Sequence, residues 1–289
     1  MYTAPITKML NSAWSRDLLM NIARQGPIPE HIALIMDGNR RFARTHGMPI
    51  EQGHRLGGSA LEKVLEACYI AGVKVITVYA FSIENFQRPR EQVESLMALL
   101  REQIAIYSAP GGMAEEFDVA IRALGRLELF DEQTREAINK SVEKTRKGKR
   151  GILNVCMAYT SRDEMTRAIR RSVEECPPTA ITAQLLSDKM DTADNPPVDL
   201  LVRSSGVYRL SDFLLWQLHR DTQIQIVDTL WPDFGVWELF MVLLRWQRTR
   251  TTTRSRSPAV YHQTSSSISI ALPLLLSFLS AVSYYFLTV

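Results

Sequence analysis

Cysteine is scarce in this 289-residue sequence, which contains only Cys68, Cys156 and Cys176. No two of them form a CxxC pair or stand at any other spacing typical of a metal site. An odd and sparse set of cysteines is typical of proteins in a reducing compartment, where buried free thiols are the ordinary state. The sequence therefore predicts a fold that neither disulfides nor structural zinc stabilise.

Several motifs that identify common enzyme classes are also absent. The sequence has no GxGxxG, no GxxxxGKS or GxxxxGKT, no HExxH and no GxSxG. These absences argue against a dinucleotide-binding Rossmann domain, a P-loop nucleotidase, a zinc protease and an α/β-hydrolase. No DDxxD pair occurs either, so the sequence does not predict an aspartate-rich metal site for a diphosphate.

Acidic residues are missing from the last part of the chain. Five arginines and no Asp or Glu occur from Arg245 onward, so the first 244 residues carry 29 basic and 31 acidic side chains. The formal net charge of +3 therefore comes from the tail. A nucleic-acid-binding domain needs a basic surface of its own, so the nearly neutral body argues against a nucleic-acid partner.

Charge of either sign is absent from the last 22 residues, Ile268 to Val289. About 20 apolar residues span a bilayer, and the arginines upstream would stay in the cytosol by the positive-inside rule. We therefore expect residues 268–289 to form a transmembrane tail after a basic, Ser/Thr-rich linker over 249–267. A tail without regular structure is the alternative, because Pro273 and several serines make the segment only moderately hydrophobic. Residues 1–25 lack an apolar run long enough for a secretory signal.

Apolar runs of strand length alternate with helical patterns through the rest of the chain. The predicted strands cover 31–37, 73–81, 119–124, 152–159, 199–203 and 223–227. The predicted helices cover 13–25, 59–71, 91–107, 131–147, 162–175, 182–190, 211–219 and 236–248. This alternation predicts an α/β fold with a mostly parallel central sheet flanked by helices. We assign residues 1–27 to an N-terminal amphipathic helix region and 28–248 to one domain that carries the site.

Side chains suited to phosphate follow the first predicted strand, at the end where parallel sheets bind ligands. Asp37 and Gly38 precede Asn39, Arg40 and Arg41. The glycine lets backbone N–H groups approach an anion, and arginines bind phosphate through charge-assisted hydrogen bonds. The carboxylate of Asp37 would repel that anion, so a Mg²⁺ ion between the two is expected. The alternative is a helix start followed by solvated arginines.

Two further strand ends have a similar composition. The residues concerned are Ser82, Glu84, Asn85, Phe86 and Arg88 after 73–81, and Arg203, Arg209 and Ser211 around the end of 199–203. His54 offers another donor, although a lone histidine is more often structural. Two separate arginine clusters indicate two anionic groups, and hence two phosphorylated substrates.

Five segments occur in an order and spacing that resemble the cis-prenyltransferase family: HIALIMDGNRRFA, YAFSIENFQR, LNVCMAYTSR, DLLVRSSGVYRLSDFLLWQ and LWPDF. The family includes undecaprenyl and dehydrodolichyl diphosphate synthases. The resemblance covers about residues 28–248 and is strongest to the fungal and other eukaryotic catalytic subunits. It implies an enzyme that condenses isopentenyl diphosphate repeatedly onto an allylic, farnesyl-type diphosphate. The product would be the long-chain polyprenyl (dehydrodolichyl) diphosphate that dolichol synthesis and protein glycosylation require.

The resemblance also implies a role for each site residue. Asp37 matches the catalytic aspartate that holds Mg²⁺, and Asn85 matches a residue proposed to assist deprotonation. The residues matched to the allylic substrate are Gly38, Asn39, Arg40, Arg41, Phe42 and His54. Those matched to the next substrate loop are Ser82, Glu84, Phe86 and Arg88, and those matched to isopentenyl diphosphate are Arg203, Arg209 and Ser211. Leu96, Leu99 and Leu100 are candidates for the wall of an apolar tunnel, with ordinary core packing as the alternative.

Two departures from the family pattern carry expectations of their own. Gln223 stands where bacterial members have a metal-binding glutamate, so Asp37 and the diphosphates would carry more of the Mg²⁺ coordination. Single-subunit members end with an Arg-x-Gly motif, but Gly235 is the last glycine here. The resemblance therefore implies a heteromer with a Nogo-B-receptor-type subunit that supplies this motif, at the endoplasmic reticulum membrane with the catalytic domain facing the cytosol. A non-catalytic accessory subunit of the same complex is the alternative, which the presence of Asp37 and Arg41 disfavours.

Overall fold

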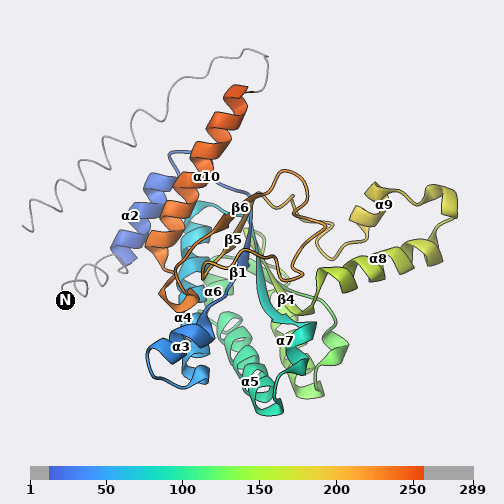
Figure 1. The fold of residues 1–289 in the computed structure, drawn as a ribbon, viewed down its shortest axis with the longest axis horizontal. Helices are drawn as coiled ribbons and strands as arrows, with labels where there is room; N and C mark the ends of the chain where they lie inside the picture. Colours follow the sequence, from blue (N-terminus) through green and yellow to red (C-terminus); the bar gives the residue numbers. More distant parts are fainter. Residues whose placement is uncertain (1–12, 257–289) are drawn as a thin grey trace, which may run out of the picture. The chain divides into compact units, whose positions relative to one another are not determined.

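The computed structural model describes residues 13–256, which divide into two compact units. The larger unit, Pro29–Gly235, contains a six-stranded sheet in the order β3-β4-β2-β1-β5-β6 (Figure 1). The described part of the smaller unit consists of residues 13–28 and 236–256. Each unit is a separate compact body, and the sheet belongs entirely to the first.

All six predicted strands are present, and every pairing between them is parallel. The strands are β1 (His31–Ile35), β2 (Val75–Ser82), β3 (Val119–Leu124), β4 (Gly151–Tyr159), β5 (Leu200–Arg203) and β6 (Gln223–Ile226). Each ends within two residues of its predicted limits. Runs of buried β-branched and other apolar residues, as in the fully buried β1, are typical of parallel strands covered on both faces. The predicted fold class is confirmed.

The helices of the larger unit fill the connections between strands. They are α3 (Asn39–Thr45), α4 (Ile50–Ala71), α5 (Arg90–Tyr107), α6 (Met113–Glu116), α7 (Glu132–Thr145), α8 (Ser161–Glu175) and α9 (Ala183–Asp188). Short 3-10 turns are η1 (Ile83–Gln87), η2 (Leu127–Leu129), η3 (Pro178–Ala180) and η4 (Trp231–Asp233). Helix α4 begins at Ile50, before the predicted start at residue 59. The glycines of this first part lower its helix propensity, but α3 packs against them.

The helix predicted over 211–219 does not form, and this prediction is wrong. Ser211, Asp212 and Leu214 all have positive φ angles, of 52°, 59° and 49°, which are incompatible with an α-helix. Hydrogen bonds to the start of α8 hold the segment instead. The N–H of Ser161 donates to the carbonyl of Asp212 (2.7 Å), and the N–H of Leu215 donates to the Ser161 hydroxyl (2.9 Å). Tertiary contacts therefore override a local helical pattern.

The two faces of the sheet have different coverings. On one face, β2 and β4 contribute Val78, Leu153 and Val155 to a space bounded by α4 and α5. On the other face, a core cluster packs residues of the 213–218 segment against β1 and β4, with Phe213 and Leu214 completely buried. Figure 1 shows α8 and α9 projecting away from the sheet. The substrate-sized space therefore lies on the α4–α5 face.

The smaller unit pairs α2 (Ala13–Ala23) with α10 (Val236–Arg256). The Gln247 side-chain amide donates to the carbonyls of Ala23 (2.8 Å) and Pro27 (2.9 Å). The predicted N-terminal helix is confirmed, but α10 continues to Arg256 rather than ending at 248. Neither Gly nor Pro occurs between residues 249 and 256 to end a helix, so the Thr/Ser composition alone was a poor indicator of a linker.

Within residues 13–256, no helix is long and apolar enough to cross a membrane. The predicted transmembrane tail, 268–289, lies outside the described residues. So does most of the predicted linker over 249–267.

Candidate functional site

A cavity of about 450 Å³ opens at the carboxyl ends of β1, β2 and β5. Eleven of the fifteen predicted site residues line it: Asp37, Asn39, Arg40, His54, Ser82, Glu84, Asn85, Arg88, Arg203, Arg209 and Ser211. They come from segments far apart in the sequence, and the parallel strands bring them together because their carboxyl ends share one edge. The three clusters predicted separately therefore form one site.

Asp37 is held at the mouth of this cavity by contacts on both its backbone and its carboxylate. Its N–H donates to the Ser204 hydroxyl (2.9 Å), and that hydroxyl donates to the Asp37 carbonyl (2.6 Å). The Nη2 atom of Arg203 donates to Oδ2 of Asp37 at 2.8 Å, and Nη2 of Arg41 lies 3.8 Å from the same oxygen. Burial alone would raise the pKa of Asp37, but Arg203 and Arg41 outweigh it and hold the pKa below its usual value. Asp37 is therefore a fixed, ionised carboxylate.

Two arginines and a histidine lie together on the next part of the cavity wall. Arg40, Arg88 and His54 all line it. Burial, together with Arg88 and Arg40, lowers the pKa of His54 to about 4. Burial and the neighbouring Arg40 also lower the pKa of Arg88. Burial and neighbouring positive charge both disfavour the protonated forms here, so this wall would be stabilised by an anion.

The Ser82–Asn85 segment forms a closed turn at the end of β2. The Ser82 hydroxyl accepts a hydrogen bond from the N–H of Glu84 (3.2 Å), and Oδ1 of Asn85 accepts one from the N–H of Ser82 (3.2 Å). This reciprocal capping box fixes η1 over the cavity. The Oδ1 atom of Asn85 therefore binds the backbone, and Asn85 lines the cavity as part of a fixed turn.

The loop after β5 is built around the nearly buried Arg203, whose side chain is 3% exposed. Its Nη1 atom donates to the Ser211 hydroxyl (2.8 Å) and to the Arg209 carbonyl. The Asp212 carboxylate accepts hydrogen bonds from the N–H (3.0 Å) and Nε (2.7 Å) of Arg162 at the start of α8. The same guanidinium reaches Glu84 through Nη2 at 3.1 Å. Arg162 thus joins the two loops that carry predicted substrate residues.

The cavity is apolar away from its mouth. Leu96, Leu99 and Leu100 line it from α5, as predicted, and Leu153 lines it near the amino end of β4. Ser82, at the mouth, pairs with Tyr159 in the β2–β4 register. Leu153 lies six positions before Tyr159 on β4, which corresponds to roughly 20 Å of strand. The site therefore combines a cationic mouth with a long apolar channel.

Four predicted residues do not line the cavity: Gly38, Arg41, Phe42 and Phe86. Gly38 shapes the loop, because its φ of 117° and its contact with Leu230 and Trp231 exclude a side chain. Phe42 is buried and stacks on His46 with ring centroids 4.1 Å apart. Phe86 packs between Phe81 and Phe130.

Other residues that build the site had not been predicted. A Cβ on Gly57 would lie 2.2 Å from Oδ1 of Asn39, so this glycine lets α3 approach α4 closely. The indole N–H of Trp231 donates to the Gly57 carbonyl (2.8 Å). The only sequence signal was the spacing of Gly53 and Gly57, one helical turn apart, which is typical of a close helix contact. Asp212 and Arg162 gave no such signal, because their pairing is long-range.

A magnesium ion fits the donors at the mouth. Mg²⁺ is commonly bound by one or two carboxylates together with substrate phosphates, and Asp37 offers one ionised carboxylate beside the cationic walls. Within residues 13–256, no group of three His, Cys, Asp or Glu side chains could hold a metal without such help. Gln223 stands at the amino end of β6, paired with Leu200, and does not line the cavity. Asp37 is therefore the residue that would hold the ion.

The chain belongs to the cis-prenyltransferase family. A prenyltransferase family model described as undecaprenyl diphosphate synthase matches residues 35–253, and this match confirms the resemblance carried by the sequence motifs. The chain is 37% identical over 243 residues to a dehydrodolichyl diphosphate synthase complex subunit of Schizosaccharomyces pombe, which covers 81% of this chain and 92% of the relative. The corresponding human complex subunit is 39% identical over 241 residues, or 82% of this chain and 72% of the relative.

Solved structures agree with this assignment. Lavandulyl diphosphate synthase from Lavandula x intermedia, solved in complex with dimethylallyl diphosphate, superposes with a TM-score of 0.70 at 26% sequence identity. The match covers 76% of this chain and 95% of that chain. The prediction of a prenyl-transferring enzyme is confirmed, and the accessory-subunit alternative is not favoured.

Proposed function

We propose that this chain is the catalytic subunit of a dehydrodolichyl diphosphate synthase, which elongates an allylic diphosphate with isopentenyl units in the cis configuration. The observation that carries the proposal is the cavity itself. The ionised carboxylate of Asp37 stands between two walls that carry arginines at its mouth, and an apolar channel of roughly 20 Å follows. Two diphosphates and a growing hydrocarbon chain need these three environments.

Each wall has a distinct task in this proposal. Asn39, Arg40, His54 and Arg88 bind the allylic diphosphate, whose hydrocarbon chain lies along Leu96, Leu99 and Leu100. Arg203, Arg209 and Ser211 bind the diphosphate of isopentenyl diphosphate. Holding the substrates at adjacent points of one rigid edge brings the double bond of one close to the allylic carbon of the other.

The reaction breaks the allylic C–O bond and forms a C–C bond from the double bond of isopentenyl diphosphate. A proton is then lost from the new unit, and inorganic diphosphate leaves. Cationic groups that are already in place stabilise the negative charge that grows on the departing diphosphate. When bound at Asp37, Mg²⁺ would add a further positive charge to those oxygens. In this proposal Asn85, which the Ser82–Asn85 turn holds at the cavity, assists the loss of that proton.

The apolar channel holds the growing product and protects the reacting carbon from water. Leucine side chains exclude water from the allylic carbon. Water is therefore kept from capturing the positive charge that develops on this carbon as its C–O bond breaks. The test is an assay with farnesyl diphosphate and radiolabelled isopentenyl diphosphate, followed by analysis of chain length. Products longer than the primer, with cis double bonds, are expected. A chain that hydrolyses the primer without elongating it would contradict the proposal.

We also propose that the enzyme works as a heteromer. Several relatives are named as subunits of a complex, including those of Schizosaccharomyces pombe and human. The partner would be a Nogo-B-receptor-type subunit that supplies an Arg-x-Gly motif to the isopentenyl site. Expression of the chain alone and together with such a subunit tests this idea, and equal turnover in both preparations would exclude it.

A location at the endoplasmic reticulum membrane, with the catalytic domain in the cytosol, is the last part of the proposal. Its support is the uncharged segment 268–289 preceded by five arginines. Fractionation of cells that express the full chain, or a chain ending at residue 267, tests it. An unchanged membrane fraction after truncation would show that other contacts hold the enzyme there.

A further inference from the structure

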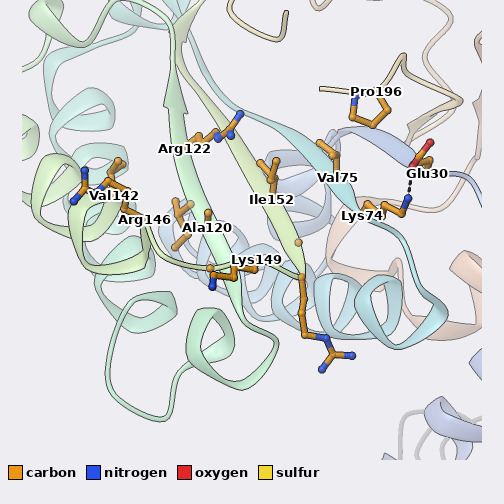
Figure 2. A pocket seen from close by; sticks show the side chains of 14 residues that line it. Glu30, Lys74, Val75, Ala120, Arg122, Val142, Arg146, Lys149, Ile152 and Pro196 are labelled. Atoms are coloured by element: carbon orange, nitrogen blue, oxygen red, sulfur yellow. Dashed lines mark hydrogen bonds and ion pairs between the residues drawn. The ribbon is translucent and has the colours of Figure 1, made fainter. Parts of the chain in front are cut away.

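A second cavity, of about 420 Å³, lies at the opposite end of the sheet from the substrate site. It is lined by residues from the first parts of β2, β3 and β4, from the end of α7, and from the turn that joins α7 to β4 (Figure 2). In a parallel sheet these strand starts share one edge. The nine residues of β4 separate this edge from the carboxyl end by roughly 25 Å. The cavity is therefore independent of the site around Asp37.

The lining of this second cavity is strongly basic. Its cations are Lys74, Arg122, Arg146, Lys149 and Arg150, and Glu30 is the one carboxylate among its lining residues. Figure 2 shows Arg146 on one side, the Lys74–Glu30 pair on the other, and Lys149 between them. Lys144 and Lys147 lie on the same stretch of chain. The local charge is therefore well above that of the nearly neutral body.

Part of this charge is already neutralised. Lys74 pairs with Glu30, Nη1 of Arg122 lies 2.7 Å from Oδ2 of Asp194, and Nε of Arg146 lies 3.4 Å from Oε1 of Glu143. In the part of the chain from 13 to 256, neither Lys149 nor Arg150 forms an ion pair. Lys149 and Arg150 are therefore available to bind an anion, and three further cations lie beside them.

The turn that presents these two cations is well fixed. The N–H of Gly148 donates to the Thr145 carbonyl (3.0 Å), and the Thr145 hydroxyl accepts from the N–H of Ile121 in β3 (3.0 Å). A Cβ on Gly148 would lie 2.4 Å from the carbonyl carbon of Val119, so the turn packs directly on β3. The N–H of Arg150 donates to the Asp118 carbonyl (2.9 Å). Lys149 and Arg150 therefore extend from a backbone with little freedom to move.

A favourable interaction with a helix dipole explains the positions of only some of these basic residues. Basic side chains in the last turn of a helix are stabilised by the carbonyl groups exposed there, and this accounts for Lys144 and Arg146 at the end of α7. Lys149 and Arg150 lie beyond the helix, next to β4. Their placement at the rim of a cavity floored by the buried Val75 and Ala120 needs another explanation.

We infer that this amino-edge cavity binds a phosphate-bearing anion. Lysine and arginine are the side chains that recognise phosphate, by point charge and by bidentate hydrogen bonds respectively. The apolar floor would accept the uncharged part of the same ligand. A phospholipid headgroup and a soluble diphosphate share this chemistry. This inference does not depend on the function proposed for the site at the other end of the sheet.

The test uses the full chain, with its partner subunit where activity requires it, and two probes. The first probe is vesicles of phosphatidylcholine mixed with phosphatidic acid, compared with phosphatidylcholine alone. The second is inorganic diphosphate in a calorimetric titration, with the substrate site filled by thio analogues of both substrates. The variants are Lys149→Glu/Arg150→Glu and the milder Lys149→Gln/Arg150→Gln. The matched control is Lys63→Glu/Arg170→Glu, which changes the net charge equally at exposed positions on α4 and α8.

The charge-reversal variant should lose more than about tenfold in affinity for one probe, because each lysine or arginine near an anionic surface contributes roughly a fivefold preference. The neutral variant should lose less affinity, and the affinity of the control should stay close to that of the original protein. Loss confined to the vesicles identifies a lipid headgroup as the ligand, and loss confined to diphosphate identifies a soluble one. Prenyl transfer in detergent should be unchanged. Both variants matching the control with both probes would overturn the inference.

Discussion

The Nη2 atom of Arg203 lies 2.8 Å from Oδ2 of Asp37, and this ion pair joins the two walls of the cavity to which we assign the diphosphates. Arg203 belongs to the wall assigned to isopentenyl diphosphate, and Asp37 to the wall assigned to the allylic substrate. A cation that binds Asp37 would compete with Arg203 for the same oxygen. Arg203 would then be freer to bind the second diphosphate.

Replacement of Asp37 by alanine should reduce turnover by at least about 100-fold, the usual loss on removing one electrostatic contact to a transition state. Asp37 is partly exposed at a strand end, so the fold should persist. Initial rates and thermal unfolding, measured side by side, check both parts. Asp188→Asn, on the distant α9, is the matched control. Near-normal turnover of the Asp37 variant would refute the role assigned to this carboxylate.

Replacement of Arg209 by alanine should mainly raise the KM for isopentenyl diphosphate, by about tenfold, the size expected for one charge-assisted contact. The KM for the allylic diphosphate should change by less than about twofold. Steady-state kinetics with each substrate varied in turn provides the measurement. Arg220→Ala removes an exposed arginine outside the cavity and serves as the control. An effect confined to the allylic substrate would reverse the assignment of the two walls.

Asp212 should act as a positioning residue for the same wall. Its carboxylate caps the start of α8 through two hydrogen bonds with Arg162, and its neighbour Ser211 binds Arg203. Asp212→Ala should cost about 1 kcal/mol of folding free energy, as loss of a helix cap usually does, and should raise the KM for isopentenyl diphosphate. Asp212→Asn, which keeps an oxygen acceptor, should restore most of the affinity. If alanine lowers stability and leaves this KM unchanged, the residue is only structural.

The lowered pKa of His54 predicts a specific pH dependence of stability. The pKa is about 4 in the folded protein and 6.5 in the unfolded chain, so the unfolded state binds more protons between these values. The stability that depends on neutral His54 is complete above pH 6.5 and is lost as the pH falls toward 4. From pH 6.5 to 5 the free energy of unfolding should fall by up to about 2 kcal/mol through this group alone. Urea unfolding of the protein and of His54→Gln measures the difference, and parallel pH curves would contradict the prediction.

The apolar channel predicts control of product length. Leu99 lines it from α5, so Leu99→Trp should fill part of the channel and shorten the longest product by at least one isoprene unit. The first condensations should proceed at nearly the original rate, because the mouth is untouched. Chromatography of radiolabelled products provides the readout, with Leu129→Trp at an exposed position as the control. An unchanged distribution of lengths would place the growing chain elsewhere.

Much of this architecture could be predicted because its signals are local. The strands were recognisable as short β-branched runs, and polar clusters at their ends marked one edge of the sheet. The 211–219 segment shows where this reasoning fails. Its apolar spacing resembles a helix, but contacts with Ser161 and Arg162, some fifty positions away, hold three of its residues at positive φ. Phe42 was predicted to bind substrate but does not line the cavity, because it stacks on His46 instead. This contact depends on how the side chains pack, which the sequence pattern does not show.

The contact between Trp231 and the Asp37–Gly38 loop has a consequence for synthesis of the protein. The N–H of Trp231 donates to the Asp37 carbonyl (3.0 Å), its indole binds the Gly57 carbonyl, and it packs on Gly38. The first strand leaves the ribosome early, but the loop that follows it can reach its final shape only after residue 231 has emerged. A nascent chain therefore remains without activity until nearly all of the larger unit has been translated.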